Sequence, residues 1–382
     1  MYGAGTDSKM VQFLRRFDYV QFAAVLVLLT IGLIFIRSTG IQVDTAASRA
    51  FFTKQLQWVM IGFGVYFIAA VTDYRAVLFR VGSGVLYVVS LFLLIYVLFA
   101  GARVWGATRW INFGSFQLQP SEPAKLAVIA VLAIIFSNSF LRSNRLLLSL
   151  SSFGITGLPF FLIAIEPDLG SAMSLVPICC AMIFCAGIKW RYIIFFLLAA
   201  ALGLGVLTVD YLREKPVLLK NYQRNRIRIF LNPDSDRRNL GHNAYQAKLA
   251  TGSGGLTGKG IGQGTQNELG FLPQTVANND FIFSVIAEET GFIGVLTLLG
   301  AYFMLLYSIL RTAFFAPLFG RYLAIGGATL IFFHVFVNIG MSLGLTPITG
   351  LPLPLVSYGG SFILTVMLTL GVMQSVYIHN EI

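Results

Sequence analysis

Long apolar runs recur along the chain, most of them around 20 residues long and separated by shorter polar or basic segments. The apolar residues within each run are continuous and do not alternate with polar residues, so the runs predict membrane-spanning helices and not barrel strands. The fold class is therefore predicted to be an all-α polytopic membrane protein with about ten transmembrane helices. We expect these helices near residues 18–37, 55–72, 77–100, 122–139, 150–165, 169–187, 190–209, 281–310, 321–345 and 355–378.

The longest interruption of this pattern is the segment 210–280, between the seventh and eighth predicted helices. It contains an arginine-rich stretch at 221–233 and a glycine-rich stretch at 252–264. A loop of this length is uncommon inside a compact domain unless it is functional. We expect it to hold short amphipathic helices that lie on the membrane face. The chain is then one transmembrane domain, residues 1–382, with this loop inside it.

Composition supports a membrane protein. Hydrophobic residues make up 57% of the chain and charged residues 11%, whereas an average soluble domain is about 25% charged. The formal net charge is +11, but the basic residues lie in the segments between apolar runs. They favour contacts with anionic membrane lipids or phosphate groups, and no aromatic–basic motif indicates a nucleic-acid partner. The three cysteines and three histidines show no spacing typical of metal ligands.

Lysine and arginine are unevenly distributed between the two sides of the predicted helices. The N-terminus, short loops and adjoining helix ends of one side hold eleven, and the short loops and adjoining helix ends of the other side hold six. Cytoplasmic loops carry the excess of positive charge, so both termini are predicted to be cytoplasmic. The outward-facing loops are then 38–54, 101–121, 166–168, 210–280 and 346–354.

Carboxylates at or inside predicted spans are candidates for chemistry, because ionisable groups in a membrane are costly. Asp280 ends the long loop and begins the eighth predicted helix, at the water boundary, which suits a general base. The alternative is a helix N-cap, and the two roles are compatible. Glu288 and Glu289 follow on the same helix and cannot share one face. We expect one to face a cavity and the other to pair with a neighbouring helix.

A second candidate group precedes and begins the fourth predicted helix. Arg109 lies in the preceding loop, and Glu122 and Lys125 are three residues apart on one helix face. One interpretation is a local ion pair that allows two charges to enter the membrane. The other is an outward phosphate or pyrophosphate site with Arg109 and Lys125 as donors.

The segment 338–361 is the third group. It holds three prolines and three glycines between 346 and 361, so it cannot be one continuous helix. Irregular backbone at membrane depth must be buried in protein or line a cavity. We therefore predict a structured, re-entrant element there. The glycine-rich stretch 252–264 matches no nucleotide-binding fingerprint.

Short motifs follow one another in a fixed order along nearly the whole chain. They are Arg109-Trp110, Gln119 to Glu122 with Lys125, Glu166 to Gly170, Tyr222-Gln223 with Arg226 and 230–233, Gly252 to Gly255 with Gly258 to Gly260, Asp280 to Phe283 with Glu288-Glu289, and Pro352 to Pro354 with Ser357 to Ser361. This ordered set resembles the SEDS family (shape, elongation, division and sporulation), whose members include RodA and FtsW. The short termini resemble RodA more than FtsW. The family often has Thr where this chain has Asn279.

The resemblance implies a peptidoglycan glycosyltransferase of the bacterial cytoplasmic (inner) membrane, acting in cell-wall elongation and cell shape. Its substrate would be lipid II, an undecaprenyl-pyrophosphate-linked disaccharide peptide, polymerised at the outer face. Its partner would be a class B penicillin-binding protein. Asp280 occupies the position of the family's essential aspartate. Two alternatives stay open, a lipid II flippase or transporter and a non-catalytic scaffold for a penicillin-binding protein.

The expected site follows from the chemistry of that reaction. Asp280 would serve as the base for the acceptor hydroxyl, because a pyrophosphate leaving group needs no strong acid. Arg109 and Lys125 would stabilise the pyrophosphate, with a divalent cation, Mg²⁺ or Mn²⁺, as a possible cofactor whose ligands the sequence does not name. The remaining residues assigned to substrate or pyrophosphate binding are Glu122, Arg226, Lys259 and Ser357. Glu288 and Glu289 are assigned supporting roles.

Overall fold

The computed structural model describes most of the chain. The described residues are 13, 15–41, 46–79, 81–104, 107–114, 116–166, 168–187, 191, 194, 198, 205, 209–210, 221–231 and 240–380. The predicted helix at 190–209 lies outside the described residues except for a few isolated positions. Residues 211–220 and 232–239 of the long loop also lie outside the described residues.

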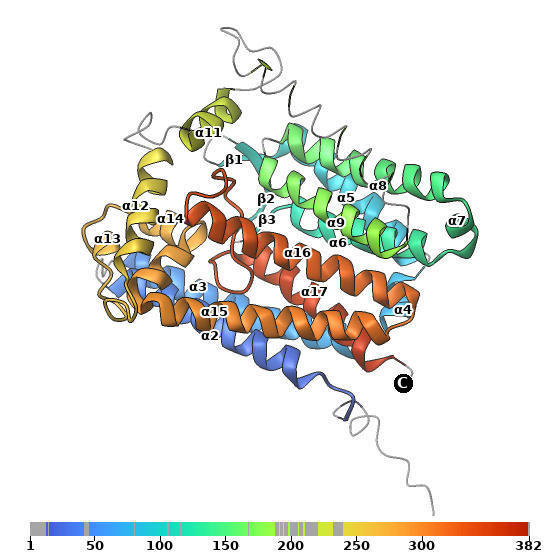
Figure 1. Cartoon of the computed structure of the whole chain (residues 1–382), viewed down its shortest axis with the longest axis horizontal. Helices are drawn as coiled ribbons and strands as arrows, with labels where there is room; N and C mark the ends of the chain where they lie inside the picture. The colour runs from blue at the N-terminus through green and yellow to red at the C-terminus, as the bar shows by residue number, and fades with distance from the viewer. Residues whose placement is uncertain are drawn as a thin grey trace, which may run out of the picture.

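Long apolar helices form the body of the described chain (Figure 1). They are α2 (Tyr19–Ile41), α3 (Ala46–Val71), α5 (Val81–Ala100), α6 (Ser121–Ser137), α8 (Arg145–Ile165), α9 (Leu169–Cys185), α15 (Ile282–Phe315), α16 (Leu318–Ser342) and α17 (Gly360–Ile378). Each overlaps a predicted span, but α3 begins at Ala46 and not near 55 as predicted, so part of the predicted loop 38–54 is helical. Among the described residues, seven of these helices are long and apolar enough to cross a membrane. The other two, α6 and α9, have 17 residues each.

The shorter elements connect these helices. They are α4 (Tyr74–Leu78), α7 (Ser139–Ser143), α11 (Asn221–Leu231), α12 (Leu240–Ser253), α13 (Thr265–Glu268), α14 (Gln274–Asn279), β1 (Ala102–Val104), β2 (Ala107–Phe113) and β3 (Phe116–Leu118). The long loop thus contains short helices, as predicted. Figure 1 shows α12, α13 and α14 at one end of the bundle, with α4 and the C-terminus at the other.

A small sheet was not predicted. Strands β1, β2 and β3 pair antiparallel in chain order, within the segment 101–121 that the sequence analysis treated only as a loop. Phe113 pairs with Phe116 across a tight turn in which Gly114 has φ +65°. Glycine populates this left-handed region readily, so it suits such a turn. The strands are only three and seven residues long, too short for their alternation to stand out in the sequence.

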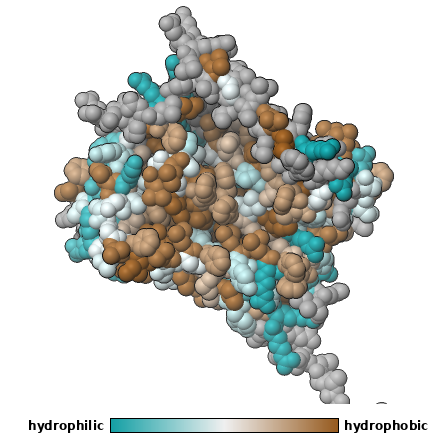
Figure 2. Space-filling model, viewed as in Figure 1, coloured by the Kyte–Doolittle hydropathy of each residue, from teal (hydrophilic) through white to brown (hydrophobic). Residues whose placement is uncertain are grey.

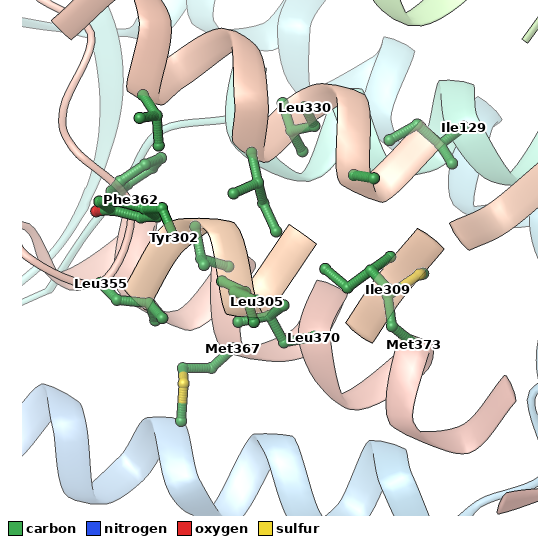
Figure 3. Packing of buried hydrophobic residues seen from close by; sticks show 14 of the residues in the cluster. Ile129, Tyr302, Leu305, Ile309, Leu330, Leu355, Phe362, Met367, Leu370 and Met373 are labelled. Carbon is green, nitrogen blue, oxygen red and sulfur yellow. The ribbon is translucent and has the colours of Figure 1, made fainter. Parts of the chain in front are cut away.

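Helices α16 and α17 form the centre of the bundle. In its most apolar window, α17 is 78% buried, whereas the corresponding window of α5 is 22% buried. Helix α17 packs on α3, and α16 packs on α15, α6 and α9. Figure 3 shows part of this core, where Leu305 and Ile309 of α15 lie near Leu370 and Met373 of α17. The loop helices α12 and α14 pack against this apolar body through α15.

The outside of the bundle is apolar as well. Phe92 and Phe99 of α5 and Phe303 and Phe314 of α15 are among the large side chains that are exposed. Figure 2 shows hydrophobic residues gathered over the middle of one face, with hydrophilic residues towards its margins. A monomeric soluble protein rarely exposes so much apolar surface, so this band is the part that contacts lipid. The chain is a multi-pass membrane protein.

Helix α15 departs from the predicted single helix, because it is broken at Gly291, where φ is +64° and ψ is −161°. The glycine-rich segment 255–260 lies alongside the break. The amides of Lys259 and Gly260 donate to the carbonyls of Glu288 and Glu289 at 3.0 and 2.9 Å. Beyond the break, the amide of Phe292 donates to the Gly255 carbonyl at 2.9 Å. The loop thus satisfies backbone groups that the interrupted helix cannot pair.

The segment between α16 and α17 is irregular and largely buried, which confirms the predicted non-helical element. Leu353, Val356 and Ser357 are almost completely buried, and Leu355 has φ +66°. The last helix begins at Gly360 and not at 355 as predicted, because the chain is still in this irregular conformation at Leu355. The segment reaches the α14–α15 junction, where Asp280 lies.

Candidate active site

Asp280 lies at the junction between α14 and α15, and the residue is half-buried. Its amide donates to the Val276 carbonyl at 3.0 Å, so the residue closes the end of α14. The N-cap of α15 is Phe281, with no side-chain cap hydrogen bond. The prediction that the Asp280 side chain caps the eighth helix is therefore wrong. Its carboxylate is available for another role.

Two arginines lie near the Asp280 carboxylate. Burial raises the pKa of Asp280 to about 6, while the positive charges of Arg226 and Arg109 act in the opposite direction. Arg226, on α11, donates from Nη1 to the Thr349 carbonyl at 2.9 Å. A Cβ atom built on the next residue, Gly350, would lie 3.5 Å from Asp280 Oδ2. The arginine-rich helix, the irregular segment and the aspartate thus meet at one place.

Arg109 belongs to β2 and links this place to the end of α8. Its Nε donates to the Glu166 carbonyl at 3.4 Å, and its Nη1 lies 3.8 Å from Asp168 Oδ1. Asp168 also accepts hydrogen bonds from Gln119 Nε2 at 2.8 Å and Ser121 Oγ at 3.4 Å. These contacts hold Arg109 by the acidic turn that follows α8. No site role was predicted for this turn from the sequence.

Glu166 differs from the other carboxylates in this region. It is almost completely buried, and neither carboxylate oxygen has a hydrogen-bond partner within the described part of the chain. Burial, followed by the negative charge of Asp168, raises the pKa of Glu166 to about 8, against the influence of Arg109. The burial of Glu166 therefore favours its protonated form. In the sequence, Glu166 is marked by its position after an apolar run and by its place in the motif Glu166 to Gly170.

Lys125 and Glu122 form an ion pair inside the bundle, on the first turns of α6. Lys125 Nζ lies 2.8 Å from Glu122 Oε1 and 3.1 Å from His334 Nε2, and the lysine is completely buried. His334 Nδ1 lies 3.2 Å from the Pro352 carbonyl, which can only accept, so Nδ1 carries the proton and Nε2 accepts from the lysine. The local ion pair is thus present, and His334 is a satisfied core residue.

The prediction that one of Glu288 and Glu289 pairs with a neighbouring helix is confirmed for Glu289, which contacts Ser38 of α2. The prediction that the other faces a cavity is wrong, because Glu288 contacts the glycine-rich loop, as Glu289 also does. Glu288 Oε1 accepts from Lys259 Nζ at 2.6 Å and from Thr265 Oγ1 at 2.9 Å. Glu289 accepts from Ser38 Oγ at 2.6 Å and from the Gly262 amide at 3.0 Å. The loop wraps around the helix end, so side chains about 100° apart reach the same segment. Both glutamates support the fold of this loop.

Ser357 has backbone partners. Its Oγ donates to the Asn279 carbonyl at 2.6 Å and accepts from the Leu353 amide at 2.8 Å. Of the residues predicted to form the site, the structure therefore brings Asp280, Arg226 and Arg109 together. It pairs Lys125 with Glu122 and Lys259 with Glu288, and it uses Ser357 to hold the backbone beside Asp280. Within the described residues, no group of three or more His, Cys, Asp or Glu side chains converges as a metal site.

Comparisons with known proteins show the family of this chain. The family of cell cycle proteins that comprises FtsW, RodA and SpoVE matches residues 19–382. The peptidoglycan glycosyltransferase MrdB of Escherichia coli strain K12 is 39% identical over 305 residues, 78% of this chain and 78% of that protein. The peptidoglycan glycosyltransferase RodA of Treponema pallidum is 32% identical over 94% of this chain and 97% of its own length.

A solved structure supports the same relationship. It concerns the structural coordination of polymerization and crosslinking by a peptidoglycan synthase complex. One of its chains is 29% identical to this one, with a TM-score of 0.75, and the alignment covers 96% of this chain and 98% of that chain. The family match extends over nearly the whole sequence and includes every residue discussed above. The chain belongs to the FtsW/RodA/SpoVE family, the SEDS proteins.

Proposed function

We propose that this protein is a peptidoglycan glycosyltransferase that joins lipid II disaccharides into glycan strands at the outer face of the bacterial cytoplasmic membrane. Its relatives in Escherichia coli and Treponema pallidum carry that activity in their names. The observation that carries the proposal is the half-buried Asp280 carboxylate beside two arginines, at the end of the bundle where the loop helices gather. In this arrangement the carboxylate can act as the base, and the two arginines can stabilise an anionic leaving group.

The proposed reaction needs one base and a cationic environment. The acceptor 4-hydroxyl attacks the anomeric carbon of the donor sugar, and the bond from that carbon to the lipid pyrophosphate breaks. Asp280 takes the hydroxyl proton, for which a pKa of about 6 is well suited, because the group is mostly ionised at neutral pH and still basic. Arg109 and Arg226 stabilise the negative charge on the departing pyrophosphate.

The other predicted ligand residues are engaged with protein groups in this structure. Lys125 is enclosed with Glu122 and His334, Lys259 contacts Glu288, and Ser357 holds the backbone of Asn279. We restrict the proposed pyrophosphate contacts to Arg109 and Arg226, because these are the two cations whose charges act on the Asp280 carboxylate. The roles of Lys125, Glu122, Lys259 and Ser357 towards substrate stay predictions.

A divalent cation, Mg²⁺ or Mn²⁺, would fit next to Arg109. Such ions usually bind one or two protein carboxylates together with phosphate oxygens of the substrate. Neither buried carboxylate oxygen of Glu166 has a hydrogen-bond partner among the described residues, and Asp168 is two positions away. These two residues would hold the ion, which would supply further charge stabilisation to the pyrophosphate. The steps assigned above to Asp280 and the two arginines do not depend on it.

We also propose the cellular setting. A class B penicillin-binding protein would be the partner, since the similar solved structure is a complex that coordinates polymerization and crosslinking. Both termini would be cytoplasmic, and the loop at 210–280 would face outward within a single domain, as the distribution of Lys and Arg favours. The product would serve cell-wall elongation and cell shape.

The test is polymerisation of lipid II by the purified protein in complex with its partner, followed by analysis of glycan length. We expect Asp280→Asn to lower the rate at least about 100-fold, the usual contribution of a general base, without loss of the complex. Asp73→Asn is the matched control, because Asp73 caps α4 at the opposite end and Asn caps equally well. An Asp280→Asn variant with normal polymer would overturn the proposed mechanism.

The same series separates the alternatives. A flippase would move lipid II across liposome membranes without forming polymer, in the wild type and in Asp280→Asn alike. A scaffold would bind its partner and stimulate crosslinking equally well with or without the aspartate. Polymer formation by the wild-type complex that is lost in the variant excludes both.

A further inference from the structure

Three successive carbonyl groups at the end of α14 accept hydrogen bonds from parts of the chain far along the sequence. The Asn278 carbonyl accepts from the Tyr358 amide at 2.9 Å. The Asn279 carbonyl accepts from Ser357 Oγ at 2.6 Å. The Asp280 carbonyl accepts from Asn338 Nδ2 at 2.9 Å. The backbone that carries the Asp280 side chain is thus held at each consecutive peptide.

Asn338 makes the contact nearest to the carboxylate. It is completely buried in α16, and its Nδ2 also donates to the Leu351 carbonyl at 2.8 Å. Both partners are carbonyl oxygens, so the amide can be oriented in one way only. Leu351 follows Gly350, which lies against Asp280 Oδ2. One amide group therefore fixes both the backbone of the aspartate and the segment that forms the wall beside its carboxylate.

The burial of Asn338 makes an unfavourable contribution to the free energy of folding. Its Oδ1 is buried and has no hydrogen-bond partner in the described structure, and an unpaired buried acceptor is unfavourable. An apolar residue of similar size would avoid that cost. The cost is offset by the two donations from Nδ2, to Asp280 and to Leu351. The junction also lacks a side-chain cap of its own, since Phe281 provides none.

We propose that Asn338 is a positioning residue for Asp280: it holds the carboxylate at the correct distance from the acceptor hydroxyl and from Arg226 and Arg109. This inference rests on the proposed function, because Asp280 is assigned there as the base. A misplacement of a reacting group by about 1 Å can lower a rate about 100-fold. Asn338 donates to the Asp280 and Leu351 carbonyls and not to either arginine, so its loss should affect the chemical step more than substrate binding.

The experiment compares Asn338→Leu with wild type in the complex with the partner, using lipid II at a series of concentrations and pH values. Leu has the same branched shape as Asn and removes both donated hydrogen bonds. We expect kcat to fall about 10- to 100-fold with KM within a factor of about two, and the acidic limb of the pH profile to move. The control is Ser342→Ala on the same helix, since Ser342 Oγ donates only to the Asn338 carbonyl.

Two further variants test the role of Asn338. Asn338→Ser retains one donor and adds no bulk, so it serves if the Leu variant fails to fold, and we expect an intermediate kcat. The double variant Asp280→Asn/Asn338→Leu should be no slower than Asp280→Asn alone, because a residue that acts through Asp280 has no effect without it. Additive losses, or a folded Asn338 variant with wild-type kcat and pH profile, would overturn the inference. An active Asp280→Asn variant would instead refute the proposed function.

Discussion

Arg226 donates a hydrogen bond from Nη1 to the carbonyl oxygen of Thr349 at 2.9 Å. This bond joins α11, in the long loop, to the irregular segment before α17, 123 residues further along the chain. Gly350, the next residue, lies against the Asp280 carboxylate. The same short stretch of backbone therefore anchors the cation and lies beside the proposed base, so the charge of Arg226 acts on the pKa of Asp280.

The first prediction concerns the pH dependence of polymerisation. Asp280 acts as a base only when ionised, and its pKa is raised to about 6 from the ordinary 3.8. We expect kcat/KM to decrease tenfold per pH unit below about pH 6 and to be level from there to neutral pH. Initial rates measured between about pH 4.5 and 7.5 test this. A limb near pH 4 would contradict burial of the carboxylate.

The second prediction concerns Arg226. Its charge lowers the pKa of Asp280, so Arg226→Gln should shift the acidic limb to higher pH. Loss of a pyrophosphate contact should also decrease kcat/KM about 10- to 100-fold at neutral pH. Arg228→Gln is the matched control, because Arg228 lies on the same helix and is exposed. Equal effects of the two substitutions would indicate a general charge effect of α11 and not a specific contact.

The third prediction separates two roles for Lys125. If it is an internal ion pair, Lys125→Met leaves Glu122 buried without its cation and should destabilise the protein by about 3–5 kcal/mol. The double variant Lys125→Met/Glu122→Gln should recover most of this stability. Thermal unfolding of the purified protein in detergent measures both. A stable Lys125→Met protein with a large loss of kcat would instead favour the predicted contact with pyrophosphate.

The fourth prediction concerns the glycine-rich loop. Gly258 has φ +77°, and a Cβ atom there would lie 2.2 Å from the Glu289 carbonyl oxygen. Gly258→Ala should therefore destabilise the docked loop by more than about 1 kcal/mol and lower the unfolding temperature. Gly252→Ala is the control, since a Cβ atom at Gly252 would have nothing within 4 Å and its φ is ordinary. An unchanged unfolding temperature for Gly258→Ala would mean that the loop is not docked in solution.

Most of the bundle could be predicted from the sequence, because each membrane span appears there as a continuous apolar run. The break in α15 could not, since Gly291 looks like any glycine tolerated in a membrane helix. Its conformation depends on the segment 255–260, which pairs with it from a distant part of the sequence. The last helix begins later than predicted for a similar reason. Leu355 is apolar, but its positive φ is imposed by the surrounding segment.

The site was predictable in part. Asp280, Arg109 and Arg226 stand out by charge, position and resemblance, and the structure brings them together. The partners of Lys125 and Lys259 were not all evident, because the fold decides which carboxylate or imidazole each lysine meets. Asn338 lies in an apolar run with no local feature that points to Asp280. Its contact exists only because α16 passes the α14–α15 junction.

The glycine-rich segment has a consequence for measurements on the native state. The amides of Phe292 and Ile293 follow the break in α15, and their acceptors are the carbonyls of Gly255 and Leu256. In the first turn of an isolated helix, these two amide protons would exchange quickly with solvent water. Here the hydrogen bonds to the loop protect both protons from exchange. The exchange rate of these two helix amides therefore reports how often the loop opens. Hydrogen–deuterium exchange at these two positions therefore follows the loop without any label placed on it.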